Sequence, residues 1–142
     1  MPAVIVNRQR SVPVRVAELR RAARRALAAV GRPAGTVEIA LVDDAEIRRL
    51  NATWRGVRRR TDVLAFPLPT AEAGDLGQLV ISAEAARRQA RTLAVGVADE
   101  LALLVTHGVL HLVGYDDRDP VEADLMHRRE REILGDRAPT RL

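Results

Sequence analysis

The sequence contains no cysteine and no lysine, and it has only one Phe, one Tyr and one Trp. The absence of cysteine excludes disulfide bonds and thiolate metal sites, so any metal ion must be bound by His, Asp or Glu. Because 47% of the residues are hydrophobic and aromatic side chains are scarce, the core must be aliphatic. Every basic side chain apart from histidine is an arginine. A G+C-rich genome explains this bias, which also suits phosphate recognition.

The chain also lacks an apolar run of membrane-spanning length, and its N-terminus lacks a signal-peptide pattern. We therefore expect a cytoplasmic protein without a membrane partner. The 142 residues predict a single domain, residues 1–142, that buries roughly 70% of the surface of its unfolded chain. The net charge of +4 is modest, so the distribution of the arginines matters more than their number.

The spacing of apolar residues predicts a small sheet and several helices. Strands are expected at residues 3–6, 36–42, 62–66 and 78–82, and helices at about 12–30, 44–54, 83–96, 97–114 and 120–134. Capping patterns mark four helix starts, at Ser11 with Pro13, Asp43 with Glu46, Ser82, and Asp119 with Pro120 and Glu122. Two prolines and two glycines predict a loop over residues 67–77. Strands mixed with helices, without strict alternation, predict an α+β fold of about four strands covered by about five helices.

Two histidines stand four residues apart inside an apolar run, in the stretch HGVLHLVGYDD at residues 107–117. Residues four apart share a helix face with about 5–6 Å between their Cβ atoms, so His107 and His111 can reach one metal ion. Gly108 keeps the turn between them uncrowded. Gly114 should end the helix in the left-handed conformation, and the reversed chain then brings Asp117 to the open side of the ion. Two imidazoles and one carboxylate leave a position for water, which is typical of a catalytic site.

Another interpretation of this pattern is a buried helix whose histidines are satisfied by hydrogen bonds, because an HxxxH pair alone is a weak signal. The glycine turn and the downstream aspartate favour the metal site. The third histidine, His127, is expected at a polar position on the exposed side of the last helix, beside Arg128 and Arg129.

The stretch resembles the signature of the YbeY family of metal-dependent endoribonucleases, whose usual form is HGxLHLxGYDH. The last position differs, because Asp117 stands where the family has its third histidine. The resemblance implies one zinc ion bound by His107, His111 and Asp117, and the oxygen ligand should admit other divalent metals more readily. Asp116 matches the family's aspartate and is an alternative ligand, or a residue that supports the ligands.

A second segment, NATWRGVRRRTDVLAF at residues 51–66, also resembles the family pattern, with Ala65 in place of the usual serine. Arg55 matches the family's functionally important arginine, and we assign it a catalytic and substrate-binding role. The most positively charged part of the chain contains Arg48, Arg49, Arg55, Arg58, Arg59 and Arg60. An arginine-rich loop suits the backbone of single-stranded RNA, so we expect substrate to be bound also by Arg58, Arg59 and Arg60. Trp54 is expected to anchor the loop to the core.

A third segment, DLGQLVIS at residues 75–82, resembles a family strand in which Gln78 replaces an aspartate. If that aspartate supports the metal site or the substrate, Gln78 weakens the support. The resemblance covers about residues 36–134. It implies an α+β fold with a small mixed sheet, against which the histidine helix is packed.

The resemblance further implies a zinc-dependent endoribonuclease that cleaves single-stranded RNA. Members of the family act in maturation of the 16S rRNA 3′ end in the small subunit and in ribosome quality control, so the implied partners are small-subunit rRNA, the ribosomal subunit or ribosomal proteins. In this interpretation the metal polarises a water molecule or a phosphoryl oxygen, and Arg55 neutralises charge that develops on the phosphate. Either water or the RNA 2′-hydroxyl is the nucleophile.

Two other functions fit parts of the pattern. The spacing HxxxHxxGxxD resembles that of metzincin-like zinc proteases, but Gly108 stands where their general-base glutamate follows the first histidine. A non-catalytic ribosome-assembly factor could use the metal only for structure, and Asp117 in place of histidine keeps this alternative open. An open coordination position would favour the enzyme, whereas four protein ligands would favour a structural role.

Overall fold

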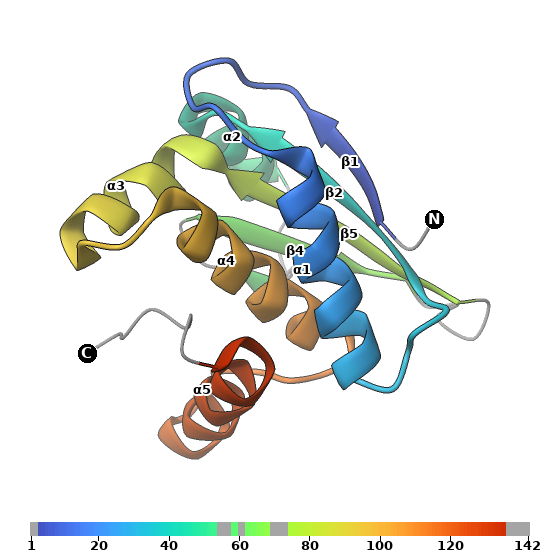
Figure 1. The fold of residues 1–142 in the computed structure, drawn as a ribbon. Coiled ribbons are helices and arrows are strands. Elements are labelled where there is room, and N and C mark those ends of the chain that lie inside the picture. The colour runs from blue at the N-terminus through green and yellow to red at the C-terminus, as the bar shows by residue number, and fades with distance from the viewer. Residues whose placement is uncertain (1–2, 54–57, 60–61, 69–73, 136–142) are drawn as a thin grey trace.

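The computed structural model of the protein describes residues 3–53, 58–59, 62–68 and 74–135. Figure 1 shows a twisted sheet with helices packed on it. The strands are β1 (Ala3–Asn7), β2 (Thr36–Val42), β3 (Arg58–Arg59), β4 (Val63–Pro67) and β5 (Asp75–Ser82). The helices are α1 (Val16–Ala29), α2 (Asp44–Thr53), α3 (Ala83–Leu93), α4 (Val97–Leu112) and α5 (Pro120–Leu134).

The sheet is mixed, with the strand order β1-β2-β5-β4-β3. Strand β2 pairs in parallel with β1 and β5, whereas β4 is antiparallel to both β5 and β3. Parallel neighbours need a crossover connection, and α1 makes the one between β1 and β2. The predicted α+β class and small mixed sheet are confirmed, and the two-residue strand β3 is added to the four strands expected.

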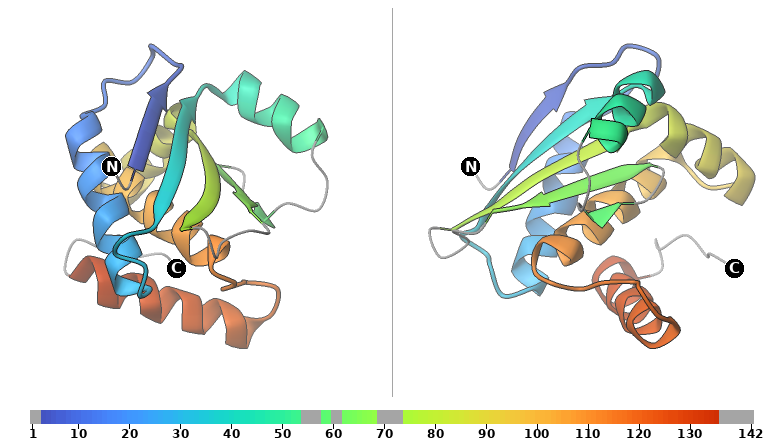
Figure 2. Two further views of the ribbon diagram at one scale, coloured as in Figure 1. Left: turned by 90° about the vertical axis from the view of Figure 1, so that its right-hand side faces the viewer. Right: turned by 180° about the vertical axis from the view of Figure 1, so that it is seen from behind.

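Helices cover the two faces of the sheet unequally (Figure 2). Helices α1 and α4 lie on one face, where Ile39 and Leu79 of the sheet join Leu104 of α4 in the main hydrophobic core. Helix α2 lies on the opposite face, where its Ile47 packs with Val80 in a smaller cluster. Most of the apolar burial is therefore on the α1–α4 side.

Helix α4 is the central helix, because it contacts α1, α3, α5 and the sheet. It comes close to the sheet at Gly108, where a Cβ would lie 2.7 Å from the methyl carbons of Leu79. On its other side, Leu110 packs against Met126 of α5. The predicted packing of the histidine helix on the sheet is confirmed. Within the described residues no single helix is long and apolar enough to cross a membrane, and α3 and α4 pass that test only as a pair bent by 117°.

Three of the predicted helix starts have the expected capping hydrogen bonds. These bonds run, at 2.8–3.1 Å, from the N–H groups of Glu46, Ala85 and Glu122 to the side chains of Asp43, Ser82 and Asp119. Each satisfies an N–H group in the first turn that has no partner within the helix. Local sequence therefore determines where α2, α3 and α5 begin.

The first helix begins at Val16, and its predicted start after Ser11 is wrong. The side chain of Gln9 explains the difference, because its Oε1 accepts from the N–H of Val12 and its Nε2 donates to the Val12 carbonyl oxygen, both at 2.9 Å. This pair of bonds holds residues 9–12 in a turn. The backbone is still extended at Arg15, with φ −90° and ψ 103°, and becomes helical after it.

Strand β5 begins at Asp75, before the predicted start at residue 78, because Gly77 lies inside the strand. Gly77 pairs with Pro67 of β4 and has φ 137°, a conformation that favours glycine. A Cβ at this position would overlap the carbonyl oxygen of Phe66. The glycine therefore marks a close approach of two strands and not a loop.

We expect Gly77→Ala to lower the free energy of unfolding by at least about 1–3 kcal/mol, because alanine disfavours this φ and its Cβ has no room. Urea unfolding followed by circular dichroism measures the change. Gly96→Ala is the matched control, since Gly96 has φ −71° and the nearest atom to an added Cβ is 3.7 Å away. The control should change by less than about 1 kcal/mol. Equal stability of the two variants would contradict the close strand approach at Gly77.

Candidate metal centre

His107 and His111 lie one turn apart on α4, and their rings are in edge-to-face contact. Both residues are almost completely buried, with 1% and 4% of their surfaces exposed. Their Nε2 atoms are 3.0 Å apart, and the ring planes cross at 83°. The two nitrogens therefore converge on one point, as the four-residue spacing predicts.

The other nitrogen of each ring has an acceptor of its own. His107 Nδ1 lies 2.5 Å from Glu130 Oε1, and His111 Nδ1 lies 3.0 Å from the carbonyl oxygen of Tyr115. A carbonyl oxygen only accepts, so His111 Nδ1 carries a proton, and a carboxylate at Glu130 requires the same of His107. When neutral, each ring then has its lone pair on Nε2. Two such lone pairs that converge at 3.0 Å can both be donated to one metal ion, so this donor set fits a metal ion.

The protonation equilibrium of His111 agrees with this arrangement. Burial lowers the pKa of His111, and the positive charge that His107 has when protonated lowers it further. Asp117, the Tyr115 carbonyl and Asp116 act in the opposite direction without reversing the shift. The His111 ring is therefore neutral at neutral pH, which is the form that can donate a lone pair to a metal ion.

A carboxylate reaches the histidine pair from the turn that follows α4. Gly114 has φ 104°, and the helix ends just before it, as predicted. One carboxylate oxygen of Asp117 and one nitrogen of each histidine all lie within 4.8 Å of one another. Asp117 is exposed, so this His–His–Asp group is closed on the helix side and open on the Asp117 side. Elsewhere in the described ranges, no three His, Asp or Glu side chains form such a group.

Asp116 directs its carboxylate into the same turn. Its Oδ1 accepts from the N–H of Asp117 at 2.8 Å, and its Oδ2 lies 2.7 Å from Nε of Arg118. These contacts stabilise the turn that presents Asp117. The geometry thus favours a supporting role for Asp116 over the alternative of a metal ligand.

The sequence interpretation missed Glu130, the partner of His107. A signal was present, because the buried positions of α5 are Met126, Glu130, Ile133 and Leu134, which places a carboxylate on an otherwise apolar helix face. His127 on the same helix is partly buried and does not belong to the His–His–Asp group. It lies outside the candidate metal centre, as expected, although it is less exposed than its neighbour Arg128.

The predicted RNA-binding segment is described only in part. Arg55 and Arg60 lie outside the described residues, as does Trp54. Arg58 and Arg59 form β3 at the edge of the sheet, and their side chains also lie outside the description. The roles assigned to these arginines remain predictions.

Gln78 lies on the sheet face that is turned away from α4. Its neighbour Leu79 packs under Gly108 of α4, and consecutive residues of a strand point to opposite faces. The Nε2 of Gln78 donates to Glu38 Oε1 at 3.3 Å, beside a hollow of about 310 Å³ that α2 also borders. Direct support of the His–His–Asp group from position 78 is therefore excluded.

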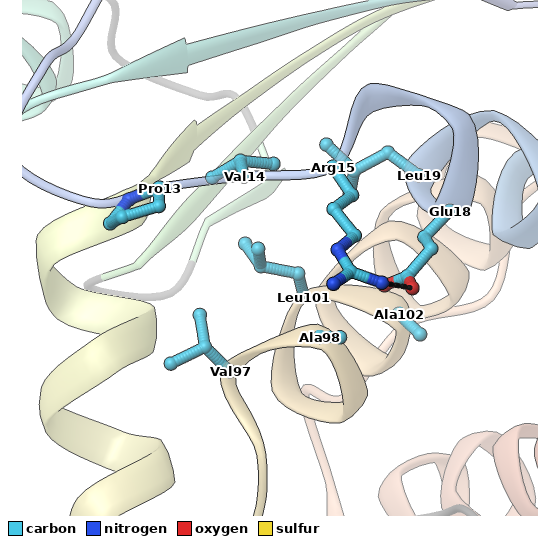
Figure 3. A pocket seen from close by; sticks show the side chains of 9 residues that line it. All are labelled: Pro13, Val14, Arg15, Glu18, Leu19, Val97, Ala98, Leu101 and Ala102. Carbon is cyan, nitrogen blue, oxygen red and sulfur yellow. Dashed lines mark ion pairs between the residues drawn. The ribbon is translucent and has the colours of Figure 1, made fainter.

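A second hollow, also of about 310 Å³, lies between the start of α1 and the start of α4 (Figure 3). Its walls include Leu19, Val97 and Leu101, and an ion pair between Arg15 and Glu18, at 3.6 Å, borders it. The histidines lie toward the other end of α4. This hollow is therefore separate from the candidate metal centre.

The fold and the His–His–Asp group define an α+β protein with a candidate metal centre. The sequence model of the family described as "Endoribonuclease YbeY" matches residues 4–137. Endoribonuclease YbeY of Pelotomaculum thermopropionicum is 42% identical over 146 residues, which cover 95% of this chain and 96% of that protein. The Geobacter sulfurreducens protein of the same name is 35% identical over 142 residues, which cover 95% of this chain and 95% of that protein. The chain belongs to the endoribonuclease YbeY family.

The extent of the match differs among relatives. Endoribonuclease YbeY of an Anaeromyxobacter species is 46% identical over 109 residues, which are 75% of this chain but 57% of that protein. The chain thus spans little more than half the length of that relative. The solution structure of TM1509 from Thermotoga maritima has a TM-score of 0.60 and 26% sequence identity to this chain, covering 94% of it and 89% of TM1509.

Asp117→His should retain or raise the affinity for zinc, because it restores the nitrogen ligand of the family signature. Asp117→Ala should lower that affinity by at least about tenfold, since changes to residues beyond the ligands already cost this much. Competition with a chromophoric chelator measures both. The control is Asp124→Ala, which removes an exposed carboxylate of α5 that pairs with Arg128. Zinc affinity that is indifferent to residue 117 would show that Asp117 is not a ligand.

Proposed function

We propose that this protein is a zinc-dependent endoribonuclease that cleaves single-stranded RNA. Family membership supports RNA cleavage, since two relatives that match over almost their whole length carry the name endoribonuclease. Metal dependence is carried by one observation, the convergence of His107 Nε2 and His111 Nε2 with the Asp117 carboxylate while both Nδ1 atoms are engaged elsewhere. We further propose a cytoplasmic location and a role in 16S rRNA 3′-end maturation and ribosome quality control, with the small ribosomal subunit or its proteins as partners.

In the proposed mechanism the three residues bind the ion, and the exposed side of the group admits substrate. His107 and His111 would hold it through Nε2, and Asp117 through a carboxylate oxygen. A zinc ion held there would supply Lewis acidity toward a water molecule or a phosphoryl oxygen. The buried histidines exclude water from the α4 side, so an RNA phosphate approaches from the exposed side of Asp117. Attack by water and attack by the RNA 2′-hydroxyl both require this same placement of the phosphate.

The packing of Gly108 weighs against a metzincin-like protease. The general base of such an enzyme would occupy position 108, where even a Cβ would lie 2.7 Å from Leu79. A glutamate at this position would require the Leu79 side chain to move within the core. The purely structural metal site is also disfavoured, since the His–His–Asp group has three members among the described residues and one of them is exposed.

We expect His111→Ala to abolish cleavage of single-stranded RNA, with a loss of at least about 100-fold, because it removes a ligand and with it the Lewis acid. Cleavage of a labelled oligoribonucleotide, with and without a chelator, measures this. Circular dichroism verifies that the variant is folded. His127→Ala is the matched control, as His127 is the remaining histidine and lies outside the His–His–Asp group. Cleavage that survives both chelation and His111→Ala would refute the metal-dependent nuclease.

Arg55→Ala should lower kcat for RNA cleavage by about 10²–10³, the usual cost of removing a group that stabilises transition-state charge. Steady-state kinetics on the same oligoribonucleotide measure kcat and KM separately. Arg24→Ala removes an exposed arginine of α1 and should leave both constants near their original values. If both substitutions changed kcat and KM equally little, Arg55 would have no role in RNA cleavage.

A further inference from the structure

Glu130 is an acidic side chain inside an apolar helix interface. It lies on α5 with 4% of its surface exposed, among buried positions that include Met126 and Ile133. Transfer of a carboxylate from water into such surroundings is strongly unfavourable unless it is paired and hydrogen-bonded. A glutamate at this place therefore needs a partner that compensates its burial.

The partner is His107 of the His–His–Asp group. Glu130 Oε1 lies 2.5 Å from His107 Nδ1, and the two residues are 23 positions apart in the chain. This bond is charge-assisted when Glu130 is ionised, and such bonds are shorter and stronger than those between neutral groups. It joins α5 to α4 at the candidate metal centre.

We propose that Glu130 is a positioning residue of the metal centre, acting through His107; this inference rests on the metal site of the proposed function. By accepting the Nδ1–H of His107, the carboxylate holds the ring in the tautomer whose Nε2 lone pair faces His111 and Asp117. It also fixes the orientation of the ring and makes Nε2 a stronger donor, as carboxylate–histidine pairs do at metal sites.

The two histidines differ in this respect, and the difference assigns the charge of the centre. His111 Nδ1 donates to the carbonyl oxygen of Tyr115, a neutral acceptor, whereas His107 Nδ1 donates to a carboxylate. When ionised, Asp117 and Glu130 would contribute two negative charges, which match the charge of a divalent cation. Glu130 therefore acts both by geometry and by charge.

Two substitutions separate these contributions. Glu130→Gln keeps an oxygen that can accept from His107 Nδ1 but removes the charge, whereas Glu130→Ala removes both. We expect Zn²⁺ affinity to fall by about 10- to 100-fold in Glu130→Gln and at least as far in Glu130→Ala. The matched control is Glu132→Gln, which neutralises an exposed carboxylate two residues further along α5 and should bind Zn²⁺ as the original chain does.

The full chain is used throughout, and the probe is the metal alone. Competition with a chromophoric chelator gives the Zn²⁺ affinity, and the absorption spectrum of the Co²⁺ form reports the ligand geometry. Unchanged Zn²⁺ affinity and an unchanged Co²⁺ spectrum in both folded Glu130 variants would overturn the role of Glu130 but leave the metal centre standing. Absence of Zn²⁺ binding by the original chain would overturn the metal centre, and this role with it.

A measurement on the original chain covers the case in which the variants do not fold. In the ¹⁵N-labelled, Zn²⁺-loaded protein, His107 Nδ1 should carry a proton that exchanges slowly with water, because it is buried against Glu130. Detection of this Nδ1–H by nuclear magnetic resonance supports the proposal. A His107 ring that is protonated at Nε2, or that binds Zn²⁺ through Nδ1, would overturn it.

Discussion

A buried imidazole needs a partner for each of its two ring nitrogens, and α4 buries two imidazoles one turn apart. The outer nitrogens are satisfied within the chain, His107 by Glu130 and His111 by the Tyr115 carbonyl oxygen. The inner nitrogens face each other at 3.0 Å, and neither can donate when both rings are neutral. The surrounding fold holds these two nitrogens in place.

Three separate parts of the chain contribute to that constraint. The sheet fixes one side of α4, because Gly108 allows the helix backbone to approach Leu79 closely. The turn after Gly114 supplies Asp117, and it is stabilised by Asp116 and its contact with Arg118. Helix α5 closes the remaining side through Met126 and Glu130. The sheet thus positions the helix that carries both histidines, the turn positions Asp117, and α5 contacts His107.

Those features that depend on local sequence were predictable. The four-residue spacing places His107 and His111 on one helix face, the φ 104° of Gly114 reverses the chain toward Asp117, and side-chain caps begin three helices. The failures involve contacts that local patterns do not encode. The turn closed by Gln9 precedes α1, so the helix begins later than predicted. Gly77 allows two strands to approach closely, whereas in the sequence a glycine at this place indicates a loop.

Glu130 shows most directly which contacts cannot be predicted from the sequence. Its contact with His107 spans 23 positions and exists only after α5 docks on α4, so no spacing rule could connect the two residues. The apolar stripe of α5 reveals that Glu130 is buried, but burial alone does not identify its partner. For the arginine segment the limit is different, because the resemblance assigns Arg55 a role while its position lies outside the described residues.

The exposure of the group is also asymmetric, and this bears on what the centre does. His107, His111 and Glu130 form a buried wall between α4 and α5, whereas Asp117 is exposed. A structural zinc site surrounds its ion with four protein ligands, while a catalytic site has three and keeps one direction accessible. In this fold the accessible direction coincides with the one position where the chain departs from the family signature. The exchange of histidine for aspartate at residue 117 therefore adds a carboxylate on the exposed side of the group, which is the side from which the proposed function brings an RNA phosphate. In the proposed function, the arginines that the sequence predicts as RNA ligands would have to offset that charge, and more so here than in a centre with three histidines.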